Sequence, residues 1–174
     1  MKIIYHCYGG AHSSVTAANI HLGNLPRDRV PRYEELTGQY LFDRHKVKDT
    51  GKMIFMGRDH FGNDIYVVGR RSRPNLLCNV ISGLSEIFLI DKKSYMLVDV
   101  SPCVNFTMKV GGVLSRRMGL ITPGRPIVTW GTRRNYKKLL AEVEKVFSWI
   151  DQKIPPGKDR QKNFLLRSPE VEYN

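Results

Sequence analysis

The chain has 174 residues, of which 28 are Lys or Arg and 16 are Asp or Glu, so its formal net charge is +12. Hydrophobic residues make up 41%, too many for an intrinsically disordered chain, and no uncharged apolar run approaches the roughly 20 residues of a membrane-spanning helix. Three widely spaced cysteines, Cys7, Cys78 and Cys103, form neither a disulfide framework nor a zinc pattern. We therefore expect a soluble cytoplasmic protein, with no cleavable signal ahead of its first strand.

The first half of the chain predicts a strand, a helix and a hairpin. Residues 2–8 form a short apolar run rich in β-formers, and residues 13–22 form a helix of small residues that ends at Gly23. Residues 24–51 are polar and contain prolines; residues 33–36 indicate one short helix. Two β-rich runs at 52–56 and 65–68 flank turn-forming residues, as in an antiparallel hairpin.

The second half predicts further alternation of helices and strands. Apolar side chains at helical intervals indicate a helix over 75–88, and residues 95–100 form an apolar strand. A helix is expected over 105–118, a last strand over 127–130 and an amphipathic helix over 134–150. We therefore predict one α/β domain over residues 1–152, a three-layer sandwich with a mostly parallel central sheet and an antiparallel hairpin, followed by a loosely held tail over 153–174.

The positive charge is concentrated in one part of the sequence. Residues 101–150 contain nine basic and two acidic side chains, so +7 of the net charge lies there. Such a zone can attract nucleic acid, nucleotides or another polyanion, or it can be a solvated surface that keeps the protein soluble.

The loop after the first strand has the composition of a phosphate-binding turn. In parallel α/β sheets ligands collect at the carboxyl ends of strands, where helix N-termini point. Glycines let the backbone amides approach a ligand, and serine hydroxyls can cap the helix or donate to an oxyanion. The loop lacks the Lys of a Walker A motif and the Gly-x-Gly-x-x-Gly of a dinucleotide site. The predicted phosphate-binding residues here are Gly9, Gly10, Ala11, Ser13 and Ser14.

Cys7 and His12 are the candidate catalytic residues. A cysteine at a strand end that faces a helix N-terminus is expected to exist partly as thiolate, which can attack phosphorus or another electrophile. His12, in the same loop, can serve as its acid or base. The alternative is that Cys7 is a small buried hydrophobe and that the two glycines form only a tight turn. Alternation along the strand places His6 on the opposite face from Cys7.

The spacing of Cys7, five residues, then Ser13 and Ser14 resembles two known phosphate loops that follow a first strand. One belongs to low-molecular-weight protein tyrosine phosphatases, the other to the cysteine-phosphorylated IIB components of sugar phosphotransferase systems. This chain has Ser13 where the phosphatase loop needs an Arg, and it has no Asp between Asp99 and Asp151 to serve as the late general acid. Tyrosine phosphatase activity is therefore not expected.

Other strand-end loops add further candidates. Asp99 lies near the end of the apolar strand over 95–100, where it can serve a ligand site or only cap the loop. Arg133 and Arg134 are expected in the first turn of the last helix, where cations oppose the helix dipole unless an anion binds. Arg71 lies in a comparable place before the helix over 75–88. No metal and no cofactor are expected, because the His and Cys residues show no recognised ligand spacing.

Residues 4–14, 17–23 and 59–71 together resemble an uncharacterised family of small proteins from spore-forming bacteria that carries only a domain-of-unknown-function label. The resemblance implies one cytosolic domain and no particular activity.

Two functions remain open from the sequence. In one, the loop over 7–14 binds a phosphate-bearing small molecule or nucleotide, with charge from Arg133, Arg134 and Arg71; Cys7 is then the nucleophile of a phosphoryl or acyl transfer, if the protein is an enzyme. In the other, the protein is a non-enzymatic basic module that binds nucleic acid or a partner protein through residues 101–150.

Overall fold

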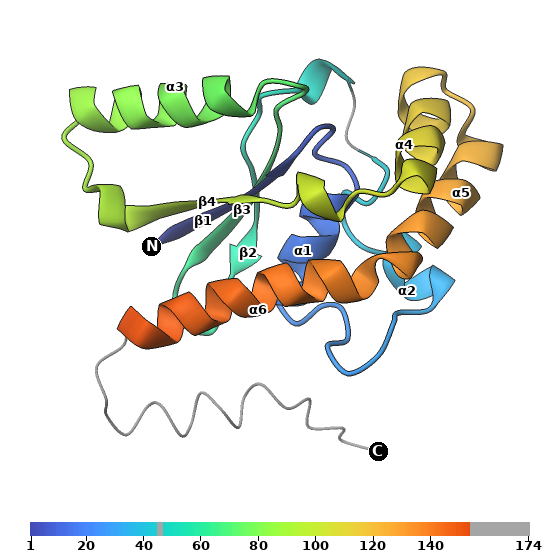
Figure 1. Cartoon of the computed structure of the whole chain (residues 1–174), viewed down its shortest axis with the longest axis horizontal. Helices are drawn as coiled ribbons and strands as arrows, with labels where there is room; N and C mark the ends of the chain where they lie inside the picture. The colour runs from blue at the N-terminus through green and yellow to red at the C-terminus, as the bar shows by residue number, and fades with distance from the viewer. Residues whose placement is uncertain (45–46, 154–174) are drawn as a thin grey trace.

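The computed structural model describes residues 1–44 and 47–153, and its centre is a four-stranded sheet with the order β2-β3-β1-β4 (Figure 1). β1 (Lys2–Cys7) runs parallel to both neighbours, β3 (Asp64–Gly69) and β4 (Tyr95–Asp99). β2 (Ile54–Arg58) pairs antiparallel with β3, with a register shift between Phe55 and Gly57. The predicted hairpin and the mostly parallel sheet are therefore confirmed.

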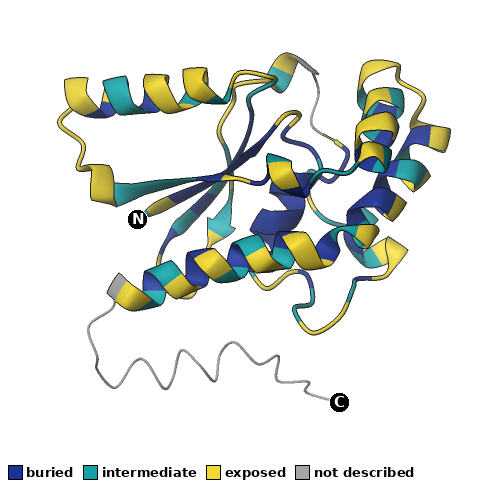
Figure 2. Ribbon diagram, viewed as in Figure 1, coloured by how far each residue is buried: buried dark blue, intermediate teal, exposed yellow. Residues whose placement is uncertain are grey.

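Helices cover both faces of the sheet and make the predicted three layers. α1 (Ser13–His21) and α6 (Tyr136–Lys153) pack on one face, and α3 (Pro74–Ile87) packs on the other (Figure 1). Strand alternation decides which side chains meet which helix. Ile3, Tyr5 and Cys7 of β1 join the larger core beneath α1 and α6, whereas Ile4 joins Val68 and Ile81 in a smaller core beneath α3. All nine residues of α1 are buried, so this helix is the centre of the domain (Figure 2).

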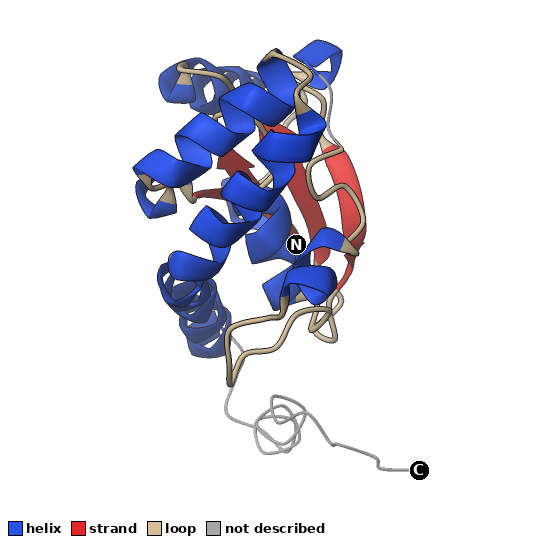
Figure 3. Cartoon of the chain, turned by 90° about the vertical axis from the view of Figure 1, so that its right-hand side faces the viewer, coloured by secondary structure: helices blue, strands red, loops and turns tan. Residues whose placement is uncertain are grey.

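A helical hairpin lies beyond the carboxyl ends of the parallel strands. It consists of α4 (Phe106–Gly112), a π-helical turn η4 (Val113–Arg117) and α5 (Ile121–Arg134), and Figure 3 shows it in front of the end of the sheet. The two helices can approach closely because glycine stands at both contacts. A Cβ added at Gly111 would lie 2.4 Å from the backbone nitrogen of Val128, and one added at Gly124 would lie equally close to the backbone nitrogen of Ser115. The shorter elements are α2 (Tyr33–Thr37) and the 3-10 turns η1 (Val47–Asp49), η2 (Lys92–Ser94) and η3 (Ser101–Cys103).

The strand expected over residues 127–130 is wrong, because these residues belong to α5. Their β-branched and aromatic composition favours a strand, but the fold places a glycine on each side of them against α4 and η4. A Cβ at Gly131 would lie 2.9 Å from the backbone nitrogen of Met108. Burial against the neighbouring helix therefore overrides local propensity, even with Pro126 inside the helix.

The other predicted helices are confirmed with small changes at their ends: 33–36, 75–88, the region 105–118 and 134–150 correspond to α2, α3, α4 with η4, and α6. The predicted tail lies outside the described residues from residue 154 onward. Within residues 1–44 and 47–153, no helix combines the length and the apolar character needed to cross a membrane.

Candidate functional site

A cavity of about 550 Å³ opens at the carboxyl end of the parallel strands. Its wall comes from the loops after β1, β3 and β4 and from one side of α4 and η4. Counted along the chain, the three parallel strands stand in the order second, first, third, and ligands of such sheets bind outside the carboxyl ends where the order reverses. Five of the lining side chains are cationic and none is acidic: Arg70, Arg71, Lys109, Arg116 and Arg117.

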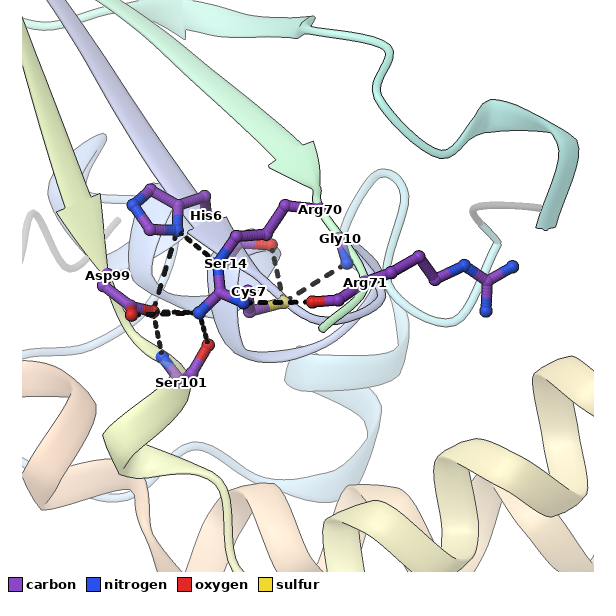
Figure 4. A network of polar contacts seen from close by, with 8 residues as sticks. All are labelled: His6, Cys7, Gly10, Ser14, Arg70, Arg71, Asp99 and Ser101. Atoms are coloured by element: carbon purple, nitrogen blue, oxygen red, sulfur yellow. Dashed lines mark hydrogen bonds and ion pairs between the residues drawn. The ribbon is translucent and has the colours of Figure 1, made fainter. Parts of the chain in front are cut away.

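The loop after β1 wraps around the sulfur of Cys7. The backbone N–H of Gly10 donates to Sγ over 3.2 Å, and the Ser14 hydroxyl lies 3.3 Å from the same sulfur (Figure 4). Gly10 has a φ of 68°, which favours glycine. The loop also crosses directly over the end of β3, because a Cβ at Gly69 would lie 2.6 Å from the carbonyl oxygen of Gly9. This turn therefore requires glycine both within it and beneath it.

Arg70 joins the ends of the three parallel strands. Its Nε donates to Nδ1 of His6 over 3.0 Å, one terminal nitrogen reaches both carboxylate oxygens of Asp99 at 3.1 and 2.9 Å, and the same nitrogen contacts the Ser101 hydroxyl at 2.8 Å (Figure 4). The other terminal nitrogen donates to the carbonyl oxygen of Arg71. Arg70 is thus a buried structural cation with its donors already engaged.

Burial, hydrogen bonds and the charge of Arg70 together determine the protonation states of His6 and Asp99. Because Nδ1 of His6 accepts a hydrogen bond, its ring is neutral with the proton on Nε2, and burial lowers the pKa of His6. Burial acts to raise the pKa of Asp99, but hydrogen bonds from Ser101 and the neighbouring His6 and Arg70 outweigh it, and the pKa is lowered. Asp99 is therefore an anion that neutralises Arg70.

His12 is held by a buried carboxylate that sequence reasoning missed. Its Nε2 lies 2.9 Å from Oδ1 of Asp43, whose side chain is fully buried. Asp43 also accepts hydrogen bonds from the Ser115 hydroxyl at 2.7 and 2.6 Å and from Nε of Arg125 at 3.0 Å. Arg116 donates to its backbone carbonyl. Burial acts to raise the pKa of Asp43, but the hydrogen bonds from His12, Ser115 and Arg125 lower it to about 2.

This carboxylate fixes the orientation of the His12 ring. With Nε2 directed at Asp43, the other side of the ring faces α4, where a Cβ on Gly112 would lie 3.4 Å from Cε1 and 3.6 Å from Nδ1. Cys7 and His12 both line the cavity. The carboxylate of Asp43 thus holds the His12 imidazole at the cavity, on whose wall the Cys7 thiol also lies.

Most of the predicted site residues come together. Cys7, Gly9, Ala11, His12 and Ser13 line the cavity, and so does Arg71, whose guanidinium lies over the Tyr8 ring and whose Nε donates to the Thr50 hydroxyl. Gly10 and Ser14 contact the sulfur. Asp99 holds Arg70, which also lines the cavity.

Arg133 and Arg134 do not line this cavity. They end α5, whereas we expected them to begin the last helix, because the residues before them are helical. Nε of Arg133 donates to the carbonyl of Pro31, and the guanidinium of Arg134 lies 5.4 Å from the centre of the Trp130 ring. At the C-terminal end of a helix a cation is favourable by itself, so the argument for an anion at these two residues no longer holds.

The histidine at the end of α1, His21, lies away from the cavity. It is buried, and its Nδ1 lies 2.8 Å from the Tyr5 hydroxyl and its Nε2 lies 3.0 Å from Oδ2 of Asp59. In residues 1–44 and 47–153, no group of three His, Cys, Asp or Glu side chains is placed to hold a metal ion.

Nothing in the sequence indicated Asp43. Arg70 and the cations of α4 and η4 were not among the predicted site residues, although the latter belong to the basic zone over 101–150. Arg70 carried a signal, since it lies two residues after the predicted strand over 65–68. Asp43 carried none, because it lies in the aperiodic polar stretch over 24–51 and has a positive φ of 53°.

The family described as "Protein of unknown function (DUF3189)" matches residues 2–147. The chain belongs to this family. The family description states no activity, so the function has to be argued from the site. Comparisons with curated proteins and with solved structures find no match.

Proposed function

We propose that this protein binds a phosphate-bearing small molecule in the cavity at the end of β1, and that Cys7 performs a phosphoryl or acyl transfer on it. The observation that carries the proposal is the charge of the wall, which has five cations and no carboxylate. Arg70 is neutralised by Asp99, and Arg116 lies near Asp43. Arg71, Lys109 and Arg117 form no ion pair with a carboxylate in the part of the chain that the structure describes.

An anion relieves the repulsion among these three cations. A phosphate group offers several anionic oxygens to several cations at once. The first N–H groups of α1, which have no partners within the helix, add donors beside Cys7. The loop has Ser13 where the phosphatase loop that it resembles has an Arg, and Arg117 of η4 supplies a guanidinium group from another part of the cavity wall.

The rest of the wall indicates an organic portion of the ligand. Tyr8, Val104, Met108 and Val113 line the cavity together with the cations. A volume of about 550 Å³ lies within the range of sites for nucleotide-sized molecules. We infer a ligand with a phosphate at one end and an apolar or aromatic group at the other.

The proposed chemistry uses four side chains. The Cys7 thiolate attacks phosphorus, forming the S–P bond as the P–O bond to the organic group breaks, and His12 gives its proton to the departing oxygen. Water then attacks phosphorus and gives a proton to His12, and the S–P bond breaks to release phosphate and the Cys7 thiolate. Asp43 holds the imidazole in place, and the Ser14 hydroxyl stabilises the departing sulfur. Acyl transfer follows the same course at a carbonyl carbon.

Alkylation of Cys7 tests this proposal. In a Cys78→Ser/Cys103→Ala background Cys7 is the one remaining cysteine, so iodoacetamide reports on it alone. We expect alkylation at neutral pH to be faster than that of a free thiol, and to slow when phosphate or a nucleotide is added. A Cys7 that reacts no faster than a free thiol, with no protection by any of these anions, would refute the catalytic and the binding parts together.

A basic nucleic-acid or partner-binding module is the second candidate. Residues 100–141 contain eight Lys and Arg and no Asp or Glu, which favours a polyanion. However, Arg125 and Arg133 are engaged within the fold. This candidate predicts binding to duplex or single-stranded nucleic acid that weakens steeply with salt, and an absence of binding at low salt would dispose of it.

A further inference from the structure

The outer side of α3 carries an apolar surface that the proposed function does not use. Seven residues on this helix and the turn after it are each between 46% and 92% exposed: Leu76, Val80, Leu84, Ile87, Phe88, Leu89 and Ile90. The helix appears largely exposed in Figure 2. We call these seven residues the α3 surface.

The first four members of the α3 surface form one stripe. Leu76, Val80, Leu84 and Ile87 follow one another at intervals of four, four and three residues, which places them along one side of a helix. The side that contacts the sheet is a different one, carried by Leu77, Ile81 and the buried Ser85. The apolar stripe therefore lies outside the core formed by the described residues.

Charge is almost absent from this stretch. Within Pro74–Ile87 the one charged residue is Glu86, which pairs with Lys92 at 3.0 Å. The turn that follows places Leu89 in the left-handed region, with a φ of 52° and an exposed fraction of 92%. A leucine in this conformation is disfavoured, and within its own described chain it gains little burial in return.

The exposed area matches one half of a stable interface. Together the seven residues expose on the order of 700 Å², whereas each partner contributes ~800 Å² to a standard interface and monomers seldom expose apolar patches of more than a few hundred Å².

We propose that the α3 surface is the interface of a homodimer, with a second copy of this chain as its occupant. A nearly uncharged surface has the composition of homodimer interfaces, which are more apolar than those of transient complexes. A second copy is present wherever the protein is, so it can keep this surface covered at all times. Two-fold symmetry packs the two α3 helices antiparallel, with the middle of each stripe near the axis.

Gly83 lies near the middle of this stripe and fits the crossing point of the two helices. A Cβ built there meets nothing within 4 Å, so the space beside it is open. The absence of a side chain lets two helix backbones approach closely.

Light scattering coupled to gel filtration tests the dimer with the full chain. One chain has a mass of 20.0 kDa, and we expect a dimer of twice that mass at micromolar concentrations. Leu84→Glu and Ile87→Glu should each give a monomer, since a carboxylate would be buried without a partner. Val110→Glu changes an exposed valine on α4 and should remain dimeric. A wild-type protein that is monomeric at all concentrations would overturn the proposal. That result would hold even if the monomer bound anionic lipid vesicles through the α3 surface.

A cross-link decides the matter if the glutamate variants fail to fold. In a Cys78→Ser background, Gly83→Cys should form an intermolecular disulfide with oxidised glutathione, which is reduced as the two thiols are oxidised. Val110→Cys in the same background should stay uncross-linked. Equal cross-linking of the two variants, or none, would exclude the antiparallel dimer.

Discussion

Asp43 is the residue whose replacement tests the construction of the site most severely. Its buried carboxylate connects the loop after β1 to η4 and α5 through His12, Ser115 and Arg125. Asp43→Asn keeps the shape of the side chain, but Arg125 loses its counter-ion. The new amide NH₂ group also faces groups that donate hydrogen bonds to the carboxylate, such as the Ser115 hydroxyl. The Arg125 side chain is 34% exposed, so water screens the charge that is left behind, and the main loss is that of hydrogen bonds to a charged acceptor. Such bonds contribute about 1.5–3 kcal/mol, and we expect the free energy of unfolding to fall by about that amount at neutral pH.

The pH dependence of stability gives a second measure of how much the Asp43 carboxylate contributes to the free energy of unfolding. The pKa of Asp43 is about 2 in the folded protein, against an ordinary value of 3.8. A difference of about two units corresponds to roughly 2–3 kcal/mol of stability. Because the folded-state pKa is the lower one, this contribution is fully present above about pH 4 to 5 and is lost as the pH falls toward 2. Asp43→Asn removes it, so stability should depend less steeply on pH in this range.

Urea unfolding monitored by the fluorescence of Trp130 and Trp149 measures both effects. Glu86→Gln, which removes an exposed ion pair with Lys92, is the control and should leave the unfolding midpoint unchanged. A loss of less than about 1 kcal/mol in Asp43→Asn, or an unchanged slope of stability between pH 5 and pH 2, would refute the assigned role of this carboxylate.

Three further changes have definite expected outcomes. Gly69→Ala places a methyl group against the loop carbonyl and should lower the free energy of unfolding by about 1–3 kcal/mol, whereas Gly9→Ala, whose Cβ meets nothing within 4 Å, should have a much smaller effect; equal losses would count against the close crossing. Tyr5→Phe leaves Nδ1 of His21 without its partner, and we expect a loss of about 1–3 kcal/mol in urea unfolding; no loss would show that the bond contributes nothing. Arg117→Gln should weaken phosphate binding on the order of tenfold in calorimetry, and an unchanged affinity would remove this side chain from the site.

Sequence patterns were sufficient to find the four strands of the sheet and the loop at its end. The apolar runs of β1, β3 and β4 and the turn residues between β2 and β3 have short-range signals, and parallel strands bring their carboxyl ends together. The position of Cys7 beside the helix N-terminus followed from that rule. The same rule places Arg71, which follows β3, at the cavity.

Long-range packing decided what the patterns could not. The run over 127–130 has strand composition, but the glycines at 124 and 131 let it pack as a helix against α4. Arg133 and Arg134 therefore end α5 rather than begin the last helix, which is where the sequence predicts them. Lys109, Arg116 and Arg117 reached the cavity because the α4–α5 hairpin folds across the strand ends. Asp43 is fixed by contacts with residues more than 70 positions away, such as Ser115 and Arg125.

The most direct test of the proposed binding site is a crystal of the protein soaked with phosphate and with a panel of nucleotides. We expect electron density for the phosphate group within hydrogen-bond distance of the loop amides over 9–14, close to Cys7 and facing Arg117. Density confined to other surfaces, or an empty cavity at concentrations that saturate the crystal, would contradict the account.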